Sequence, residues 1–215
     1  MTNTENGLRV PLIIYSPRTQ RAKGLKISAL AEAVDIYKTL AELSGVGLGA
    51  VEEGVDGVSL AQLVNSATPN DARSTPPPRT VARSQFPRCY TQLNNASANA
   101  PGTLPVLDRT DCQAVYKEAF DLMGYSIRTA EWRLTEWRTW DGAALKGRWD
   151  LPPNATELYD HRGAGASVSA SAAAESAAAD PFATELANVA AAPANAAILK
   201  TLRAQLHETF VLSRA

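Results

Sequence analysis

The segment MGYSIRTAEWRLTEW, residues 123–137, decides the fold class of this chain. Apolar and polar residues alternate through 123–129 and again through 132–137, and only Ala130-Glu131 separates the two runs. Alternation of this kind predicts half-buried strands, because successive side chains of a strand point to opposite faces of a sheet. A connection this short predicts that the two strands form an antiparallel hairpin.

The sequence that follows completes a small α+β unit around this hairpin. Residues 157–160, ELYD, come after Pro152-Pro153 and predict a third strand. Near the C-terminus, apolar residues recur at helical spacing: Ile198, Leu199, Leu202, Leu206 and Phe210. They predict an amphipathic helix over 194–212 that lies on the antiparallel sheet. Ala and Ser dominate residues 164–197, and this composition leaves both helix and disorder open.

Upstream of the hairpin, two elements have the character of an α/β domain. Residues 10–15, VPLIIY, form a continuous apolar run that predicts a strand buried on both faces, as in parallel sheets. Residues 35–45, DIYKTLAELSG, predict a helix that Asp35 caps at its N-terminus and Gly45 ends. A strand followed by a helix indicates the end of an α/β domain.

These elements divide the chain into three segments. Residues 1–64 are expected to form the end of an α/β core, and residues 106–215 an α+β subdomain with an Ala/Ser-rich insertion at 164–180. Residues 65–105 between them include Pro76-Pro77-Pro78 and many Asn, Ser and Thr residues. This composition predicts a loop-rich linker.

Composition excludes several classes of protein. The 215 residues are 45% hydrophobic, which is enough for a core, and the formal net charge of −1 disfavours a general polyanion binder. No apolar run approaches the roughly 20 residues that cross a bilayer. The first residues lack the basic and apolar regions of a signal peptide. With two cysteines and two histidines, a self-contained metalloenzyme is not expected.

Two pairs of residues are suited to covalent modification. Cys89 and Cys112 are either ordinary thiols or the two ends of a loop disulfide, and the sequence leaves this open. Asn95 and Asn154 begin N-x-[ST] sequons, which matter only in a secretory compartment.

Arginine and tryptophan interleave in the hairpin region. Four of each alternate along the chain: Arg128, Arg133, Arg138 and Arg148 with Trp132, Trp137, Trp140 and Trp149. Such a pattern can bind anions, sugars or bases, but in a hairpin it more often places tryptophans on the covered face and arginines outside, which we expect here. His161 and His207 have no second ligand in view, so both are expected to be structural.

Seven strings of this sequence resemble, in the same order, the type I sulfatase family and within it the iduronate 2-sulfatase branch. They are residues 9–17 (a late core strand), 35–45 (the helix after it), 56–60 (a DG-x-SL turn), 84–88 (SQFPR, against SQYPR in the branch), 123–129, 132–137 and 157–161. The resemblance covers roughly residues 3–161 and resumes at Asp180-Pro181. It implies the C-terminal part of an alkaline-phosphatase-like sulfatase fold: the last strand and helix of its α/β core, plus a small antiparallel β-sheet subdomain packed by a C-terminal helix.

The sequence departs from the family at the catalytic motif. Family members hydrolyse sulfate esters with a formylglycine made from the cysteine of C-x-P-S-R, beside a calcium ion held by Asp and Asn oxygens. Neither Cys89 nor Cys112 stands in C-x-P-S-R, and the sequence contains no Asp-Asp pair and no Asp-His-Gly string. The chain therefore looks like the carboxyl-terminal part of a sulfatase without its catalytic half. We expect it to hold no catalytic residue and no metal ligand, and to be inactive alone.

For the intact enzyme, the resemblance implies a cleft for a sulfated carbohydrate or another sulfate ester, with neither nucleic acid nor membrane as partner. Family members are often lysosomal, secreted or periplasmic. We expect Arg88, with Gln85, to contact the substrate, because an arginine fork binds sulfate or carboxylate through two hydrogen bonds. The alternative is an ion pair of Arg88 with a carboxylate between subdomains. Trp132 and Trp137 are expected in the core. A non-catalytic carbohydrate- or anion-binding module and a truncated gene model are the other readings left open.

Overall fold

The computed structural model describes residues 3–17, 26–46, 49, 54–66, 76–89, 112, 115–162 and 185–211. Its helices are α1 (Glu5–Leu8), α2 (Asp35–Ser44), α3 (Ala61–Ser66) and α6 (Ala196–Phe210), with short 3-10 helices at Lys117–Ala119 and Pro193–Asn195. Its strands are β1 (Ala82–Arg88), β2 (Leu122–Arg128), β3 (Trp132–Asp141), β4 (Lys146–Gly147) and β5 (Ala155–Asp160). Helices and a small antiparallel sheet thus occur together, as the sequence predicts.

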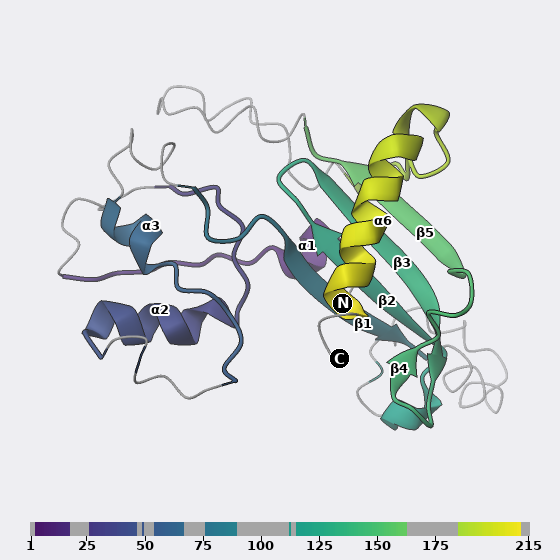
Figure 1. Cartoon of the computed structure of the whole chain (residues 1–215), viewed down its shortest axis with the longest axis horizontal. Helices are drawn as coiled ribbons and strands as arrows, with labels where there is room; N and C mark the ends of the chain where they lie inside the picture. The colour runs from purple at the N-terminus through teal and green to yellow at the C-terminus, as the bar shows by residue number, and fades with distance from the viewer. Residues whose placement is uncertain are drawn as a thin grey trace, which may run out of the picture.

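The sheet is built on the predicted hairpin. β2 and β3 pair antiparallel, and Thr129 N donates to Trp132 O at 2.8 Å, so that Ala130-Glu131 form the short connection. β1 pairs with the outer edge of β2, β5 pairs along the other edge of β3, and β4 extends the end of β3 (Figure 1). The hairpin and the third strand predicted at 157–160 are confirmed.

One face of the sheet is covered by α6, which crosses β2 and β3 in Figure 1. The helix and the sheet share one core of buried side chains: Met123, Tyr125, Ile127, Trp132, Leu134, Leu158, Leu202 and Leu206. Burial of one leucine side chain stabilises a fold by about 1.5–3 kcal/mol. The predicted C-terminal helix and its position on the sheet are therefore confirmed. None of the described helices is both long and apolar enough to cross a membrane.

The opposite face of the sheet is covered as well, by the chain around α1 and by Glu185. Asn3 and Glu5 are buried there, and Glu5 forms an ion pair with Arg133 of β3. Arg133 and Arg138 are each only 3% exposed. The prediction that the hairpin arginines lie outside is therefore wrong for these two, whereas the side chain of Arg148 is 41% exposed. Both faces of the sheet are covered, and these two arginines are buried in ion pairs.

α2 and α3 lie beside the sheet, on the left in Figure 1. α2 begins and ends where the sequence predicts, and Gly45 follows it in the left-handed conformation at φ 88°. Asp35, however, does not cap the helix. Its buried carboxylate accepts hydrogen bonds from Glu32 N and Val58 N, each at 2.8 Å, and forms an ion pair with Arg79 at 2.5 Å. Asp35 therefore joins α2 to the chain before α3 and before β1.

Residues 10–15 belong to no strand of the structure. Val10 and Ile13 are 73% and 89% exposed, and no backbone–backbone hydrogen bond joins this run to another part of the described chain. The prediction of a strand buried on both faces is therefore wrong for this structure. A strand needs a neighbour to share its hydrogen bonds, and no described strand lies beside this run.

Residues 84–88, SQFPR, lie in β1 rather than in a loop. Pro87 is tolerated because β1 is an edge strand, paired on one side with β2. The expected linker 65–105 thus contains a strand of the sheet. Its residues 67–75 and 90–105, and the expected insertion at 164–180, lie outside the described residues.

Candidate functional site

Arg88 is the last residue of β1 and is held in place by its neighbours in the chain. Its carbonyl oxygen accepts a hydrogen bond from Asp121 N at 2.8 Å, just before β2 begins. Cys89 forms a disulfide with Cys112, with 5.9 Å between the Cα atoms, a usual separation for such a bond. In the structure the two cysteines therefore pair, and the disulfide restrains the chain that leaves β1.

The side chain of Arg88 lies against two aromatic rings. Its guanidinium carbon is 4.8 Å from the ring centre of Trp137 and 5.3 Å from that of Phe86. In the sheet register, Gly124 of β2 stands between Phe86 and Trp137. A Cβ at Gly124 would come within 2.7 Å of the Trp137 ring. Because Gly124 has no side chain, Trp137 can reach across β2 toward Arg88.

Glu157 of β5 lies on the same face of the sheet and completes the group. Its carboxylate accepts hydrogen bonds from Trp137 Nε1 at 2.9 Å and from the Tyr159 hydroxyl at 3.4 Å. Burial lowers the pKa of the Arg88 guanidinium, and the charge of Glu157 opposes this change. Burial also raises the pKa of Tyr159 to about 12, and Glu157 acts in the same direction. We call Phe86, Arg88, Trp137, Glu157 and Tyr159 the Arg88 site.

One polar atom of the Arg88 site has no partner. Arg88 Nη1 is buried and makes no hydrogen bond within the part of the chain that the structure describes. The alternative expectation, an ion pair of Arg88 with a carboxylate, has no counterpart among the ion pairs of the described residues. Leaving a buried donor unpaired costs about 1–3 kcal/mol. An anionic ligand would remove this cost.

Gln85, the second expected contact residue, does not lie beside Arg88. Gln85 is exposed, and its position three residues before Arg88 places the two side chains on opposite faces of β1. The side chains in contact with Arg88 are Phe86 and Trp137, and Glu157 joins the site through its hydrogen bond with Trp137. The sequence patterns did not predict these three residues as neighbours of Arg88. Phe86 carried a signal, since residues two apart in a strand share a face. Glu157 becomes a neighbour only through the pairing of β3 with β5.

A second group of ionisable side chains lies on the same face of the sheet. Glu5, His161 and Glu185 each bring one possible ligand atom within 4.8 Å of the others. Arg133 fills this position: its Nη2 is 2.6 Å from Glu5 Oε2 and its Nε is 2.6 Å from Glu185 Oε1. Because a guanidinium already neutralises both carboxylates, the group does not fit a metal ion. It is a buried ion-pair network, which we call the Glu5 network and which includes Arg128.

The electrostatics of the Glu5 network are those of paired charges. Burial alone would raise the pKa of Glu5, but the charge of Arg128 and the hydrogen bond from Arg133 outweigh burial and lower it. Burial would likewise raise the pKa of Glu185, and the hydrogen bond with His161 together with Arg133 lowers it instead. Both carboxylates are therefore held in the charged form, which favours a role in stability.

Both histidines pack against other side chains. His161 Nε2 lies 3.0 Å from Glu185 Oε1 in the Glu5 network. His207 of α6 places its ring 4.9 Å from the ring of Trp149, and its Nε2 lies 3.2 Å from Arg138 Nη2. These contacts fit the expectation that the histidines are structural.

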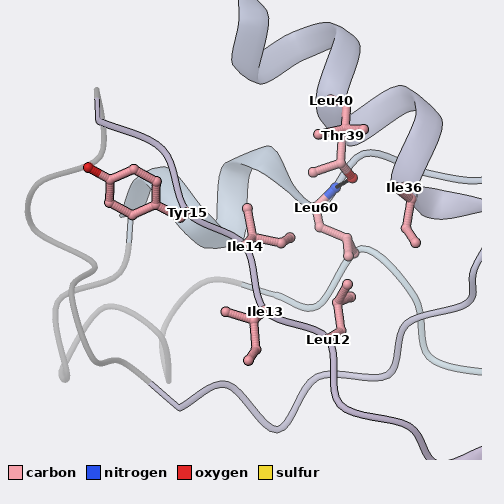
Figure 2. Close-up of a pocket in the computed structure, with 8 residues that line it drawn as sticks. All are labelled: Leu12, Ile13, Ile14, Tyr15, Ile36, Thr39, Leu40 and Leu60. Carbon is pink, nitrogen blue, oxygen red and sulfur yellow. Dashed lines mark hydrogen bonds between the residues drawn. The ribbon is translucent and has the colours of Figure 1, made fainter.

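An apolar cavity of about 230 Å³ lies apart from the Arg88 site, between α2 and the chain at residues 12–15. Figure 2 shows the side chains around it: Leu12, Ile13, Ile14, Tyr15, Ile36, Thr39, Leu40 and Leu60. The lining is apolar apart from two hydroxyl groups, so it offers little for acid–base or metal chemistry. We interpret it as incompletely covered core surface.

The comparisons with known proteins give no family for this chain. No protein-family model matches it, and no match was found among curated proteins. The sulfatase resemblance therefore rests on the seven strings, and the function is argued from the Arg88 site.

Proposed function

We propose that this chain is the C-terminal region of a sulfatase-family enzyme of the iduronate 2-sulfatase type, and that its Arg88 site binds the anionic group of a sulfated sugar or another sulfate ester. The observation that carries this proposal is the buried Nη1 of Arg88, which has no hydrogen-bond partner among the residues that the structure describes. Because Nη1 is closed to solvent, the Arg88 side chain must shift for a ligand to reach it. A sulfate or carboxylate oxygen would then accept the hydrogen bond that this nitrogen lacks, and hydrogen bonds between charged groups are stronger than neutral ones.

The surroundings of Arg88 favour an anion over a neutral ligand. The rings of Trp137 and Phe86 restrain the guanidinium by cation–π contact, so less side-chain entropy is lost when a ligand binds. Burial against these rings also reduces screening by salt, which strengthens an ion pair formed there. Glu157 partly balances the charge of Arg88. Tight binding of a sulfated ligand would therefore need further cations, which we assign to the catalytic half of the enzyme.

In this proposal the Arg88 site recognises the substrate and takes no part in cleaving the ester. Tyr159, the one hydroxyl in the site, has its pKa raised to about 12, so it is a poor nucleophile at neutral pH. In the family, formylglycine and calcium supply the chemistry of hydrolysis. The carboxylates of Glu5, Glu157 and Glu185 already accept hydrogen bonds from other side chains. Neither the Arg88 site nor the Glu5 network therefore fits a calcium ion. We assign the formylglycine and the calcium ion to the catalytic half.

A non-catalytic carbohydrate- or anion-binding module is the second candidate. One observation favours it: the Arg88 site lies entirely within the sheet, whose other face forms a closed core with α6. A module would bind its ligand tightly by itself. A sulfatase region would bind the same ligand only weakly, because the remaining contacts belong to the catalytic half. The affinity of this chain alone therefore separates the two candidates.

The test is calorimetric titration of the full chain with a sulfated disaccharide and with its unsulfated parent. We expect weak binding of the sulfated sugar only. Arg88→Lys should weaken it at least about tenfold, because hydrogen bonds to charged groups contribute about 1.5–3 kcal/mol and lysine lacks the fork. Arg83→Lys is the matched control, on the same strand but with an exposed side chain. Equal binding of both sugars, or unchanged binding by Arg88→Lys, would overturn the assignment of the site.

A further inference from the structure

A surface asparagine lies at the start of β5, directly after Pro152-Pro153. Asn154 is exposed, and with Ala155 and Thr156 it forms the acceptor sequence N-x-T. Its backbone N donates to Trp137 O at 2.8 Å, and its side-chain Oδ1 accepts from Thr139 Oγ1 at 2.9 Å. Asn154 Nδ2, the atom that would carry a sugar, makes no hydrogen bond within the described residues.

The disulfide gives a second, independent indication. Cys89 and Cys112 are paired and buried, at 2% and 6% exposure. Disulfides form and persist in oxidising compartments, which include the lumen of the endoplasmic reticulum and the extracellular space. N-linked oligosaccharides are attached in that same lumen. The sequon, which begins just before β5, and the disulfide, which follows β1, thus point to one compartment.

We propose that Asn154 is an N-glycosylation site. Asn154 Nδ2 forms a bond to the anomeric carbon of an oligosaccharide carried on a polyprenyl diphosphate. The bond from that carbon to the phosphate oxygen breaks, the polyprenyl diphosphate leaves with the electron pair, and Nδ2 loses one proton. The donor lipid and a membrane-bound oligosaccharyltransferase are the only co-reactants that this step needs, and no oxidation or reduction takes place.

The folded chain can carry a glycan on Asn154, but it cannot present the sequon to the transferase. A glycan on the exposed Asn154 side chain projects from the chain just before β5, without entering the core. Thr156, whose hydroxyl completes the sequon, is paired in the sheet opposite Glu136 and lies 3.5 Å from Arg203 Nη2 of α6. The transferase must hold the whole sequon, so the transfer precedes the pairing of β5 with β3. Modification of Asn154 therefore occurs on the chain before it folds.

The first experiment is peptide mapping of the full chain purified from the cells that make it. Treatment with peptide N-glycosidase F in heavy-oxygen water converts a glycosylated asparagine to labelled aspartate. We expect the label at position 154. An unlabelled, unmodified Asn154 would overturn the proposal, including the case in which Asn95 alone carries the label.

The second experiment uses variants of the full chain directed to the endoplasmic reticulum of a eukaryotic host by an added, cleavable signal. Asn154→Gln and Thr156→Ala should each remove one glycosidase-sensitive step in apparent mass. Thr156→Ser retains the hydroxyl and should keep the step, and so should Asn95→Gln. If Asn154→Gln leaves the number of steps unchanged, the assignment to Asn154 is wrong. The melting curve of the folded, purified chain is then measured before and after the glycosidase removes the glycan. An unchanged curve shows that the fold tolerates the glycan.

Discussion

Gly124 is the residue on which the geometry of the Arg88 site depends most directly. A Cβ at this position would lie 2.7 Å from the Trp137 ring and 2.7 Å from Asn3 Nδ2. Gly124→Ala must therefore displace the tryptophan or the chain around α1. We expect the substitution to lower the free energy of unfolding by about 1–3 kcal/mol and to change the tryptophan fluorescence of the folded chain. Urea denaturation followed by fluorescence measures both effects.

Gly49→Ala is the matched control for this substitution, because a Cβ at Gly49 meets no atom of the described residues within 4 Å. It should leave the unfolding curve within a few tenths of a kcal/mol of the original, a typical result for a surface change. If Gly124→Ala unfolds at the same urea concentration as Gly49→Ala and keeps the original spectrum, Trp137 does not depend on the missing side chain.

At this scale the sequence predicts a residue more readily than its surroundings. Arg88 could be selected because a fork-shaped cation in a short motif is a recognisable anion ligand. The expectation that Gln85 binds the ligand together with Arg88 is wrong because it requires both side chains to converge, as they can in a loop. The motif lies in a strand, and a strand points residues three apart to opposite faces. Trp137 reaches Arg88, and Glu157 reaches Trp137, only through strand pairing across the sheet, which a local pattern does not encode.

At the scale of elements, α1 is held on the sheet by charge rather than by apolar packing. The helix is four residues long, and Glu5 is its one buried residue. A helix this short has no stability of its own. Its position therefore depends on the Glu5 network, chiefly on the ion pair of Glu5 with Arg133 at 2.6 Å.

Acid should weaken the attachment of α1. The folded-state pKa values of Glu5 and Glu185 are lowered, since the basic partners outweigh burial. A carboxylate of this kind stabilises the fold above its unfolded pKa, and the contribution is lost as the pH falls through the folded value. We expect the free energy of unfolding to decline as the pH drops below the ordinary glutamate value of 4.5. Urea titrations over a pH series measure the decline.

Glu5→Gln separates this network from the other carboxylates. The substitution should cost about 1–3 kcal/mol at neutral pH, because it leaves charged partners under-satisfied, and it should flatten the acid dependence. Glu42→Gln, an exposed glutamate on α2, should keep the full dependence and the original stability. A Glu5→Gln chain that loses stability in acid as steeply as the original would show that other groups control the transition.

Elements whose signals are local were predicted, and those that depend on distant partners were not. α2 follows from its periodicity and Gly45, and the hairpin from its alternation and short connection. Residues 10–15 carry the pattern of a buried strand, but burial requires neighbours on both sides, and the described chain supplies none. Asp35 has the residue type of a helix cap, yet Arg79, far along the chain, recruits its carboxylate instead.

At the scale of the whole molecule, we expect recognition without catalysis. The C-x-P-S-R motif is absent from the sequence, and in the structure both cysteines are joined in a disulfide. The purified chain should therefore not hydrolyse an aryl sulfate or a sulfated disaccharide. Release of sulfate above the buffer rate is the measurement. Turnover that survives substitution of both Cys89 and Cys112 by alanine would refute the expectation and would point to another nucleophile.

The two parts of the molecule differ in how well they cover apolar side chains. The sheet and α6 enclose their core, whereas the cavity between α2 and residues 12–15 opens onto exposed side chains (Figure 2). Ile13 is 89% exposed, Tyr15 77% and Leu40 58%. A contiguous apolar surface of this kind binds hydrophobic dyes and promotes association. We therefore expect the purified chain to bind the dye ANS under native conditions and to self-associate as its concentration rises.

Ile13→Lys tests whether that surface is the cause. Because Ile13 has little burial to lose, a charge there should reduce dye binding and self-association while leaving the melting temperature of the sheet unchanged. Leu186→Lys is the matched control, since Leu186 is 84% exposed but lies outside the cavity lining. It should leave dye binding unchanged. A monomeric chain with one sharp melting transition and no dye binding would mean that residues 10–15 are covered in solution, and the exposed arrangement of this run would then be wrong.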